Sequence, residues 1–154
     1  MGTSFKILVA YEITNQYEYT NMDRTKQLVK KDLIYPELSY KIVGILFDVY
    51  NELGGGYREK YYQKAVSLSL KKEKILFKEQ VHAPLIYKGV SIGSNYLDFL
   101  IENKVILEIK AGENFLRKNI TQVYSYLKIN NLNLGILANF TKTGLRSKRI
   151  LNIK

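Results

Sequence analysis

The sequence predicts an α/β or α+β protein in which helices flank a mixed central sheet, with the element order ααββββαβ(β). Apolar residues follow helical spacing up to Leu53, and strand-like runs broken by glycine and proline fill residues 75–110. A helical stretch at about residues 114–130 then leads into an apolar strand at residues 132–140. This succession is typical of a sheet covered by helices on both sides.

Two helices are expected first. Between residues 38 and 53 the apolar positions have the spacing of one helix face, and Gly54, Gly55 and Gly56 end this helix because glycine readily adopts a positive φ. A second helix follows at about residues 57–72. The three glycines are not followed by Gly-Lys-Ser/Thr, so a helix stop is favoured over a phosphate-binding loop.

An antiparallel meander is expected next, with strands at residues 75–82, 85–90, 95–101 and 104–110. Pro84, Gly89 and Gly93 separate these runs. Residues 147–153 are expected to form a last short strand after the strand at 132–140.

The hairpin at residues 96–110 carries the most informative charges. If its loop is Glu102-Asn103-Lys104, Ile101 pairs with Val105 and Asp98 lies across from Glu108. Strand alternation then places Tyr96, Asp98 and Leu100 on the face opposite Leu97, Phe99 and Ile101, and Glu108 and Lys110 on the face opposite Val105, Leu107 and Ile109.

Two neighbouring carboxylates in apolar strands repel each other and favour a cation between them. A hard divalent ion such as Mg²⁺ suits oxygen ligands of this kind, and Lys110 can place its ammonium beside an anion held there. The alternative is ordinary, because acidic and basic residues flank the turns of many hairpins.

Charge indicates the class of partner. The 154-residue chain has 24 Lys and Arg against 14 Asp and Glu, a net charge of +10, and residues 117–154 contain eight basic residues and no acidic one. Such a field favours a polyanion, nucleic acid before anionic membrane, although it is also compatible with a merely soluble surface. The absence of cysteine excludes disulfides, thiolate zinc sites and cysteine nucleophiles.

Targeting signals are not found in the sequence. No apolar run has the length of a membrane span and no signal core follows the N-terminus, so no membrane partner and a cytoplasmic location are expected. Residues 1–21 are expected to be an extension, either not native to the protein, a flexible tail or an accessory strand. Residues 22–154 are expected to form a single domain.

Three further polar residues are candidates because of their spacing on the predicted helices. Glu59 begins the second helix, where an acidic residue is expected simply from the helix dipole. Gln122 and Tyr126 lie one turn apart on the helix predicted at about residues 114–130. They either reach into a cleft or lie on a solvent-exposed face.

Gly56-Tyr-Arg-Glu59-Lys-Tyr-Tyr62 matches Gly-x-x-Glu-x-x-Tyr, and with the segments at residues 40–54, 96–110 and 135–140 it resembles the small bacterial GxxExxY proteins. The resemblance covers roughly residues 31–150. That family is similar to the PD-(D/E)XK nuclease superfamily, so the resemblance implies a restriction-endonuclease-like core. Leu97 replaces the proline that precedes the first acidic residue in the superfamily pattern.

The resemblance implies roles residue by residue. Asp98 matches the first acidic position, Glu108-Ile109-Lys110 matches (D/E)-x-K, Glu59 matches the helical glutamate, and Gln122-x-x-x-Tyr126 resembles an element that positions substrate in RecB-like nucleases. It therefore implies a Mg²⁺ or Mn²⁺ ion held by Asp98, Glu108, the Ile109 carbonyl and Glu59, with Lys110 as a further catalytic residue.

The function predicted from these residues is metal-dependent hydrolysis of nucleic acid, DNA before RNA. The alternatives are a non-catalytic nucleic-acid-binding module and a protein-interaction or regulatory component on the same fold, and the sequence is compatible with a homodimer. The basic residues expected to contact phosphates are Arg117, Lys118, Lys142, Arg146, Lys148 and Arg149.

Overall fold

The computed structural model describes residues 34–153, which form three helices and five strands. The predicted extension at residues 1–21 lies outside the described residues. No helix in this described part of the chain is long and apolar enough to cross a membrane. The elements, in chain order, are α2 (Pro36–Leu53), α3 (Glu59–Lys72), β1 (Phe77–Tyr87), β2 (Val90–Ile101), β3 (Val105–Ala111), α4 (Arg117–Ile129), β4 (Leu134–Phe140) and β5 (Leu145–Leu151).

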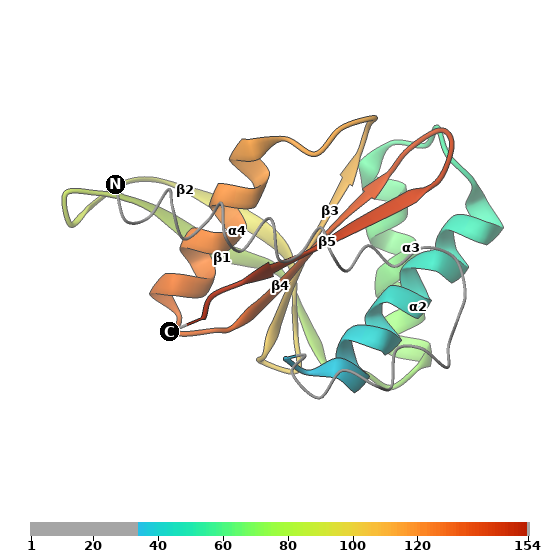
Figure 1. Cartoon of the computed structure of the whole chain (residues 1–154), viewed down its shortest axis with the longest axis horizontal. Coiled ribbons are helices and arrows are strands. Elements are labelled where there is room, and N and C mark those ends of the chain that lie inside the picture. Colours follow the sequence, from blue (N-terminus) through green and yellow to red (C-terminus); the bar gives the residue numbers. More distant parts are fainter. Residues whose placement is uncertain (1–33, 154) are drawn as a thin grey trace.

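The five strands form one mixed sheet with the spatial order β1-β2-β3-β4-β5. All neighbours are antiparallel except β3 and β4, which are parallel and are therefore joined by a crossover through α4. Helix α4 lies on one side of the sheet, and α2 and α3 lie on the other (Figure 1). The predicted fold class, a mixed sheet flanked by helices, is confirmed.

The predicted number of strands before α4 is wrong. The expected strands at residues 75–82 and 85–90 are one strand, β1, which runs through Pro84. The sheet order makes β1 an edge strand, where proline's missing N–H does not have to remove a ladder bond. The chain reverses at Lys88 and Gly89 instead, both of which have positive φ. The element order is therefore ααβββαββ.

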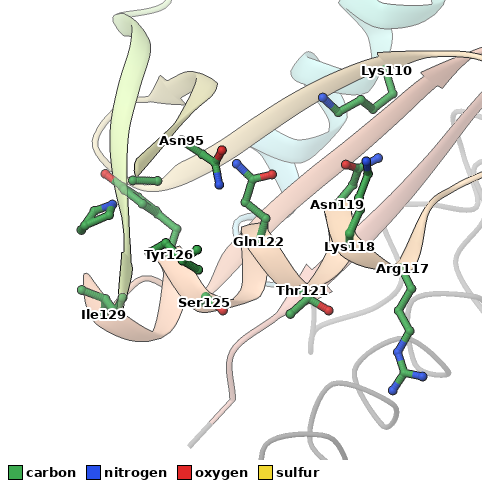
Figure 2. Close-up of a pocket in the computed structure, with 13 residues that line it drawn as sticks. Asn95, Lys110, Arg117, Lys118, Asn119, Thr121, Gln122, Ser125, Tyr126 and Ile129 are labelled. Atoms are coloured by element: carbon green, nitrogen blue, oxygen red, sulfur yellow. The ribbon is translucent and has the colours of Figure 1, made fainter. Parts of the chain in front are cut away.

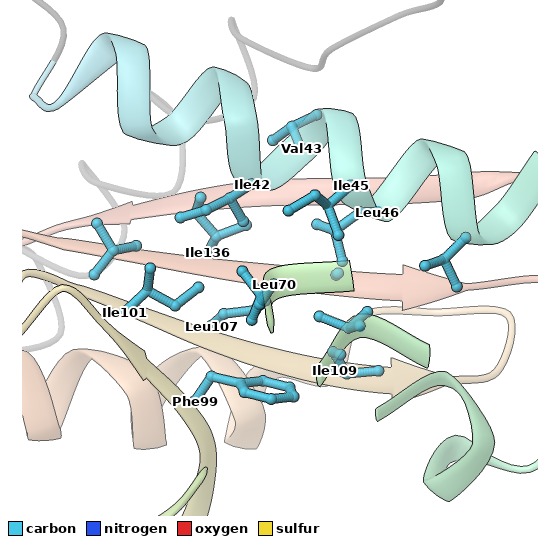
Figure 3. Close-up of a cluster of buried hydrophobic side chains, with 14 of the residues drawn as sticks. Ile42, Val43, Ile45, Leu46, Leu70, Phe99, Ile101, Leu107, Ile109 and Ile136 are labelled. Carbon is cyan, nitrogen blue, oxygen red and sulfur yellow. The ribbon is translucent and has the colours of Figure 1, made fainter. Parts of the chain in front are cut away.

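Each face of the sheet packs against helices in its own apolar core. On the α2 and α3 side, helix residues such as Ile42, Leu46 and Leu70 pack against the inward side chains of β3 and β4 (Figure 3). On the α4 side, Val123 and Leu127 pack over Ile106 and Leu137. Gly135 allows α4 to approach β4 closely, because a Cβ at this position would collide with Val123.

The side chains of the β1–β2 hairpin change from one face of the sheet to the other in the middle of the hairpin. Leu97 and Phe99 would share a face in a regular strand, but Leu97 packs in the α4 core and Phe99 in the α2 and α3 core. The pairing of β1 with β2 skips Asp98 and the residue opposite it, Gln80, which has a left-handed φ of 51°. The predicted common face of Leu97, Phe99 and Ile101 is therefore wrong, and the irregularity falls at Asp98.

Candidate active site

The β2–β3 turn has the predicted length, and it brings two carboxylates together. Ile101 pairs with Val105, and the ladder continues only to Phe99 and Leu107. Beyond Phe99 and Leu107, backbone N–H groups donate to side-chain carboxylates and not to the neighbouring strand. The Asp98 N–H donates to Oε2 of Glu108 at 3.1 Å, and the Ile109 N–H donates to Oδ2 of Asp98 at 2.7 Å.

Both carboxyl groups are buried, and this decides their protonation. Asp98 is 5% exposed and Glu108 3% exposed. Burial is the largest cause of the shifts, raising the pKa of Asp98 from 3.8 to about 6 and the pKa of Glu108 from 4.5 to about 7. The charge of Asp98 adds to the shift at Glu108, while backbone hydrogen bonds and Lys110 oppose both shifts. The pair is therefore a site where positive charge is strongly favoured.

Lys110 supplies one positive charge. Its Nζ lies 3.2 Å from Oε1 of Glu108 and 3.6 Å from Oε1 of Glu59, which reaches the site from the first turn of α3. Burial disfavours the ammonium, but the carboxylates of Glu108 and Glu59 outweigh it, and the net pKa of Lys110 is raised. The structure thus brings together Lys110, Glu108 and Glu59 from two different elements.

Gln63 is a site residue that was not predicted. Its Nε2 donates to Oδ1 of Asp98 at 2.8 Å and contacts Oε1 of Glu59 at 3.4 Å. Gln63 lies one helical turn after Glu59, so the two share a face of α3, and this spacing was the available signal. Through Gln63, the helix and the hairpin are joined by a direct hydrogen bond at the carboxylate pair.

The three predicted acidic ligands lie around the ammonium of Lys110 and the side-chain amide of Gln63. Among residues 34–153, no group of three or more acidic or histidine side chains is arranged to hold a metal ion. The carboxylate of Glu59 is held instead by Lys110 and Gln63. The adjacent, buried carboxylates of Asp98 and Glu108 fit a divalent cation, because their oxygens suit such an ion and their like charges need one. The roles of Glu59 and of the Ile109 carbonyl as ligands stay predictions.

The Gly-x-x-Glu-x-x-Tyr segment owes its local structure to Tyr62. This side chain is fully buried and stacks on Phe140 with a ring-centre distance of 4.1 Å. Its hydroxyl donates to the Gly54 carbonyl at 2.7 Å and accepts from the Tyr57 N–H at 3.2 Å. Tyr62 therefore ties the start of α3, and with it Glu59, to the glycine loop that ends α2.

Lys110 also lies at one end of a cleft between α4 and the β1–β2 hairpin (Figure 2). This α4 groove has a volume of about 660 Å³ and contains both Gln122 and Tyr126. Of the two alternatives for these residues, the cleft is therefore correct. Burial raises the pKa of the Tyr126 hydroxyl. The lining residues are Ala83, Pro84, Leu85, Asn95, Lys110, Arg117, Lys118, Asn119, Thr121, Gln122, Ser125, Tyr126 and Ile129.

A sequence model of the PD-(D/E)XK nuclease superfamily matches residues 36–150, from the start of α2 into β5. The chain belongs to this superfamily. Its members are generally nucleases that hydrolyse nucleic acid and typically use divalent metal ions, and the matched range contains every residue of the site described above. The narrower resemblance to GxxExxY proteins stays a prediction.

Two solved structures are similar to this PD-(D/E)XK chain. One is the crystal structure of SSO0001, with 15% identity, a TM-score of 0.48, and coverage of 99% of this chain and 78% of that chain. The other is an alkaline exonuclease, LHK-Exo, from Laribacter hongkongensis, with 12% identity, a TM-score of 0.43, and coverage of 84% and 75%. A search of curated proteins finds no significant match.

The predicted phosphate contacts require a correction at two positions of this superfamily member. Arg149 is 2% exposed, and its guanidinium donates to Ser39 Oγ at 3.1 Å and to the Ile34 carbonyl at 2.9 Å. Lys148 is also buried, with its ammonium 5.1 Å from the centre of the Phe115 ring. Arg149 joins β5 to α2 and to the residue Ile34 before it, and Lys148 packs on Phe115, so these buried side chains do not form a phosphate-binding surface. The other four predicted residues are exposed: Arg117, Lys118, Lys142 and Arg146.

Asn139 is a second polar residue near the site that was not predicted. It is fully buried on β4, directly beside Lys110 in the parallel β3–β4 pair. Its side-chain amide has no hydrogen-bond partner within the described part of the chain. Asn139 lies within the apolar run at residues 132–140, and that pattern predicts a buried strand without indicating a site residue.

Proposed function

We propose that this chain is a Mg²⁺- or Mn²⁺-dependent nuclease that hydrolyses phosphodiester bonds, in DNA rather than RNA. The observation that supports the proposal best is the buried carboxylate pair, Asp98 and Glu108, with the ammonium of Lys110 at 3.2 Å from Glu108. Superfamily membership supports the reaction class. The net charge of +10 supports a polyanionic substrate.

The carboxylates of Asp98 and Glu108 would hold the metal ion, with the Ile109 carbonyl and, through water, Glu59 completing the set. The bound ion would lower the pKa of a water molecule and stabilise charge on the phosphoryl oxygens. The hydrogen bonds from the Asp98 and Ile109 N–H groups fix the carboxylates in place without neutralising them. Fixed ligands of this kind need little rearrangement during the reaction.

Lys110 would stabilise the negative charge that develops on the phosphate, since its ammonium already lies beside Glu108. Glu59 would orient that ammonium from the other side, and Gln63 would hold Asp98. Gln122 and Tyr126 would position the nucleic acid, because they line the groove that begins at Lys110.

The test is cleavage of supercoiled plasmid and of single-stranded DNA with Mg²⁺, with Mn²⁺, and with EDTA. Glu108→Ala and Lys110→Ala should each lower the rate by about 10²-fold or more, because each removes charge stabilisation at the reacting phosphate. Matched controls are Glu102→Ala and Lys104→Ala, which change the same residue types in the exposed turn of the same hairpin. These controls should cleave at the wild-type rate.

Two results would contradict the proposal. One is cleavage that persists in EDTA or in Glu108→Ala, which would indicate a contaminating nuclease or a different site. The other is salt-sensitive binding of DNA with no cleavage under any metal condition, which would favour the non-catalytic binding module.

A further inference from the structure

The outer half of the β1–β2 hairpin, residues 83–96, has an unusual surface for a strongly basic protein. We call this segment the ribbon. Its only charged residue is Lys88, yet it carries six of the large exposed apolar side chains of the described structure. Leu85 is 51% exposed and Ile92 is 61% exposed. The six are Leu85, Ile86, Tyr87, Val90, Ile92 and Tyr96.

The opposite wall of the α4 groove has a different chemistry. The first turn of α4 contributes Arg117 and Lys118 to the lining, followed by polar side chains and then Ile129 at its far end. The guanidinium of Arg117 points away from Lys110 and from the ribbon, so Lys118 is the cation of this turn that is better placed to contact a strand in the groove (Figure 2). No acidic residue lines the groove. The ribbon contributes Ala83, Pro84, Leu85 and Asn95 to the facing wall, all of them uncharged. The groove therefore has one basic and polar wall and one uncharged, largely apolar wall.

This asymmetry matches one strand of nucleic acid better than two. A duplex presents phosphates along both of its edges and stacks its bases inside, whereas a single strand exposes phosphates on one side and the apolar faces of its bases on the other. The volume of about 660 Å³ lies within the range of small-molecule pockets, which is about 300–1,000 Å³. Such a groove accepts a short stretch of one strand and cannot enclose a duplex.

We propose that the α4 groove binds single-stranded nucleic acid, with phosphates along α4 and bases against the ribbon, and leads the strand to Lys110. This inference rests on the proposed nuclease function, for which it names the substrate class. The position of Lys110 supports it, because this residue lines the groove and also contacts Glu108. A strand in the groove would therefore end beside the carboxylate pair.

The test measures binding separately from cleavage, by fluorescence anisotropy in EDTA. The probes are labelled oligodeoxythymidylate, labelled oligouridylate and a labelled DNA duplex of equal length. Lys118→Glu on the α4 wall and Leu85→Ser on the ribbon should each weaken single-strand binding by about tenfold, the size of the loss when one phosphate or base contact is removed. Both residues are exposed, so both variants should keep the wild-type thermal unfolding.

The controls are matched in residue type and exposure but lie outside the groove. Lys128→Glu lies on α4 itself, and Leu68→Ser changes a leucine on α3 that is 68% exposed. Both should bind the single strands as the wild type does. An equal loss in Lys128→Glu and Lys118→Glu would overturn the inference, since the effect would then come from net charge alone.

The remaining outcomes separate this inference from the function that it extends. Duplex binding that is as tight as single-strand binding, and equally sensitive to Lys118→Glu and Leu85→Ser, would overturn the single-strand groove. Metal-dependent cleavage could still be observed in that case. Tighter binding of either single strand, lost in the groove variants, supports the inference. If no probe or plasmid is then cleaved with Mg²⁺ or Mn²⁺, the nuclease proposal fails and the binding groove stands.

Discussion

Replacing Asp98 by asparagine should make the metal-free protein more stable at neutral pH. The carboxyl is buried, and within residues 34–153 it accepts hydrogen bonds from two neutral donors, the Ile109 N–H and Gln63 Nε2. Asparagine keeps an oxygen for Ile109, and the Gln63 amide can rotate to accept from the new NH₂ group, at the cost of its weaker contact with Glu59 at 3.4 Å. The substitution Asp98→Asn thus removes the buried charge and keeps the shape.

The size and sign follow from the pKa of Asp98, which burial raises from 3.8 to about 6. Between these values the folded protein keeps a proton that the unfolded chain has released, so the free energy of unfolding falls as pH rises through this window. The loss is complete above pH 6 and amounts to about 3 kcal/mol. In a domain of this size it corresponds to a melting temperature about 6–12 °C higher for Asp98→Asn.

The assay is thermal unfolding followed by circular dichroism, in EDTA, at several values between about pH 4 and pH 8. The difference between Asp98→Asn and wild type should be small at the acid end and largest above pH 6. Asp48→Asn, at an exposed position on α2, is the matched control and should show no such trend. Adding Mg²⁺ at neutral pH should stabilise the wild type and not Asp98→Asn. A variant that is less stable than wild type at pH 8 would refute the reasoning, because the ionised carboxylate would then be a net stabiliser.

Three further outcomes are expected. Tyr62→Phe should lower the free energy of unfolding by about 1–3 kcal/mol in chemical denaturation, because it leaves the Gly54 carbonyl and the Tyr57 N–H without their partner. Arg149→Met should lower the melting temperature while leaving DNA affinity at the wild-type value, since its guanidinium is buried on Ser39 and Ile34. The log–log salt slope of duplex binding should be about −3.6 if all four exposed cations contact phosphates, and a flat profile would exclude phosphate contacts with duplex DNA. These cations are Arg117, Lys118, Lys142 and Arg146.

The parts of the site that depend on local geometry could be predicted from the sequence. A three-residue turn fixes the pairing of Ile101 with Val105, and this register predicts that Asp98 lies near Glu108. Helix α2 could also be predicted from the sequence, because its apolar spacing and its glycine stop are both local signals. Neither prediction requires knowledge of what packs against the element.

The incorrect predictions all concern residues whose environment is set by distant parts of the chain. Pro84 sits inside β1 because that strand is at the sheet edge, a property of the whole sheet. Arg149 is buried because Ser39 and Ile34, more than a hundred residues away in the chain, accept its hydrogen bonds. Charge alone does not distinguish such an arginine from one on a phosphate-binding surface. The contacts of Glu59 with Lys110 and Gln63 depend on packing in the same way, and its role as a metal ligand stays a prediction.

The break in strand pairing at Asp98 explains how two like-charged groups are held side by side in a folded core. In an uninterrupted ladder the backbone N–H groups of Asp98 and Ile109 would be committed to neighbouring strands. Here both N–H groups donate to the carboxylates. The left-handed residue Gln80 lies opposite this break, and beyond it the hairpin turns over toward α4 and forms one wall of the groove. One irregularity therefore creates the carboxylate pair and directs the adjacent groove to it, which is why the local pattern fails at the residues proposed to carry the chemistry.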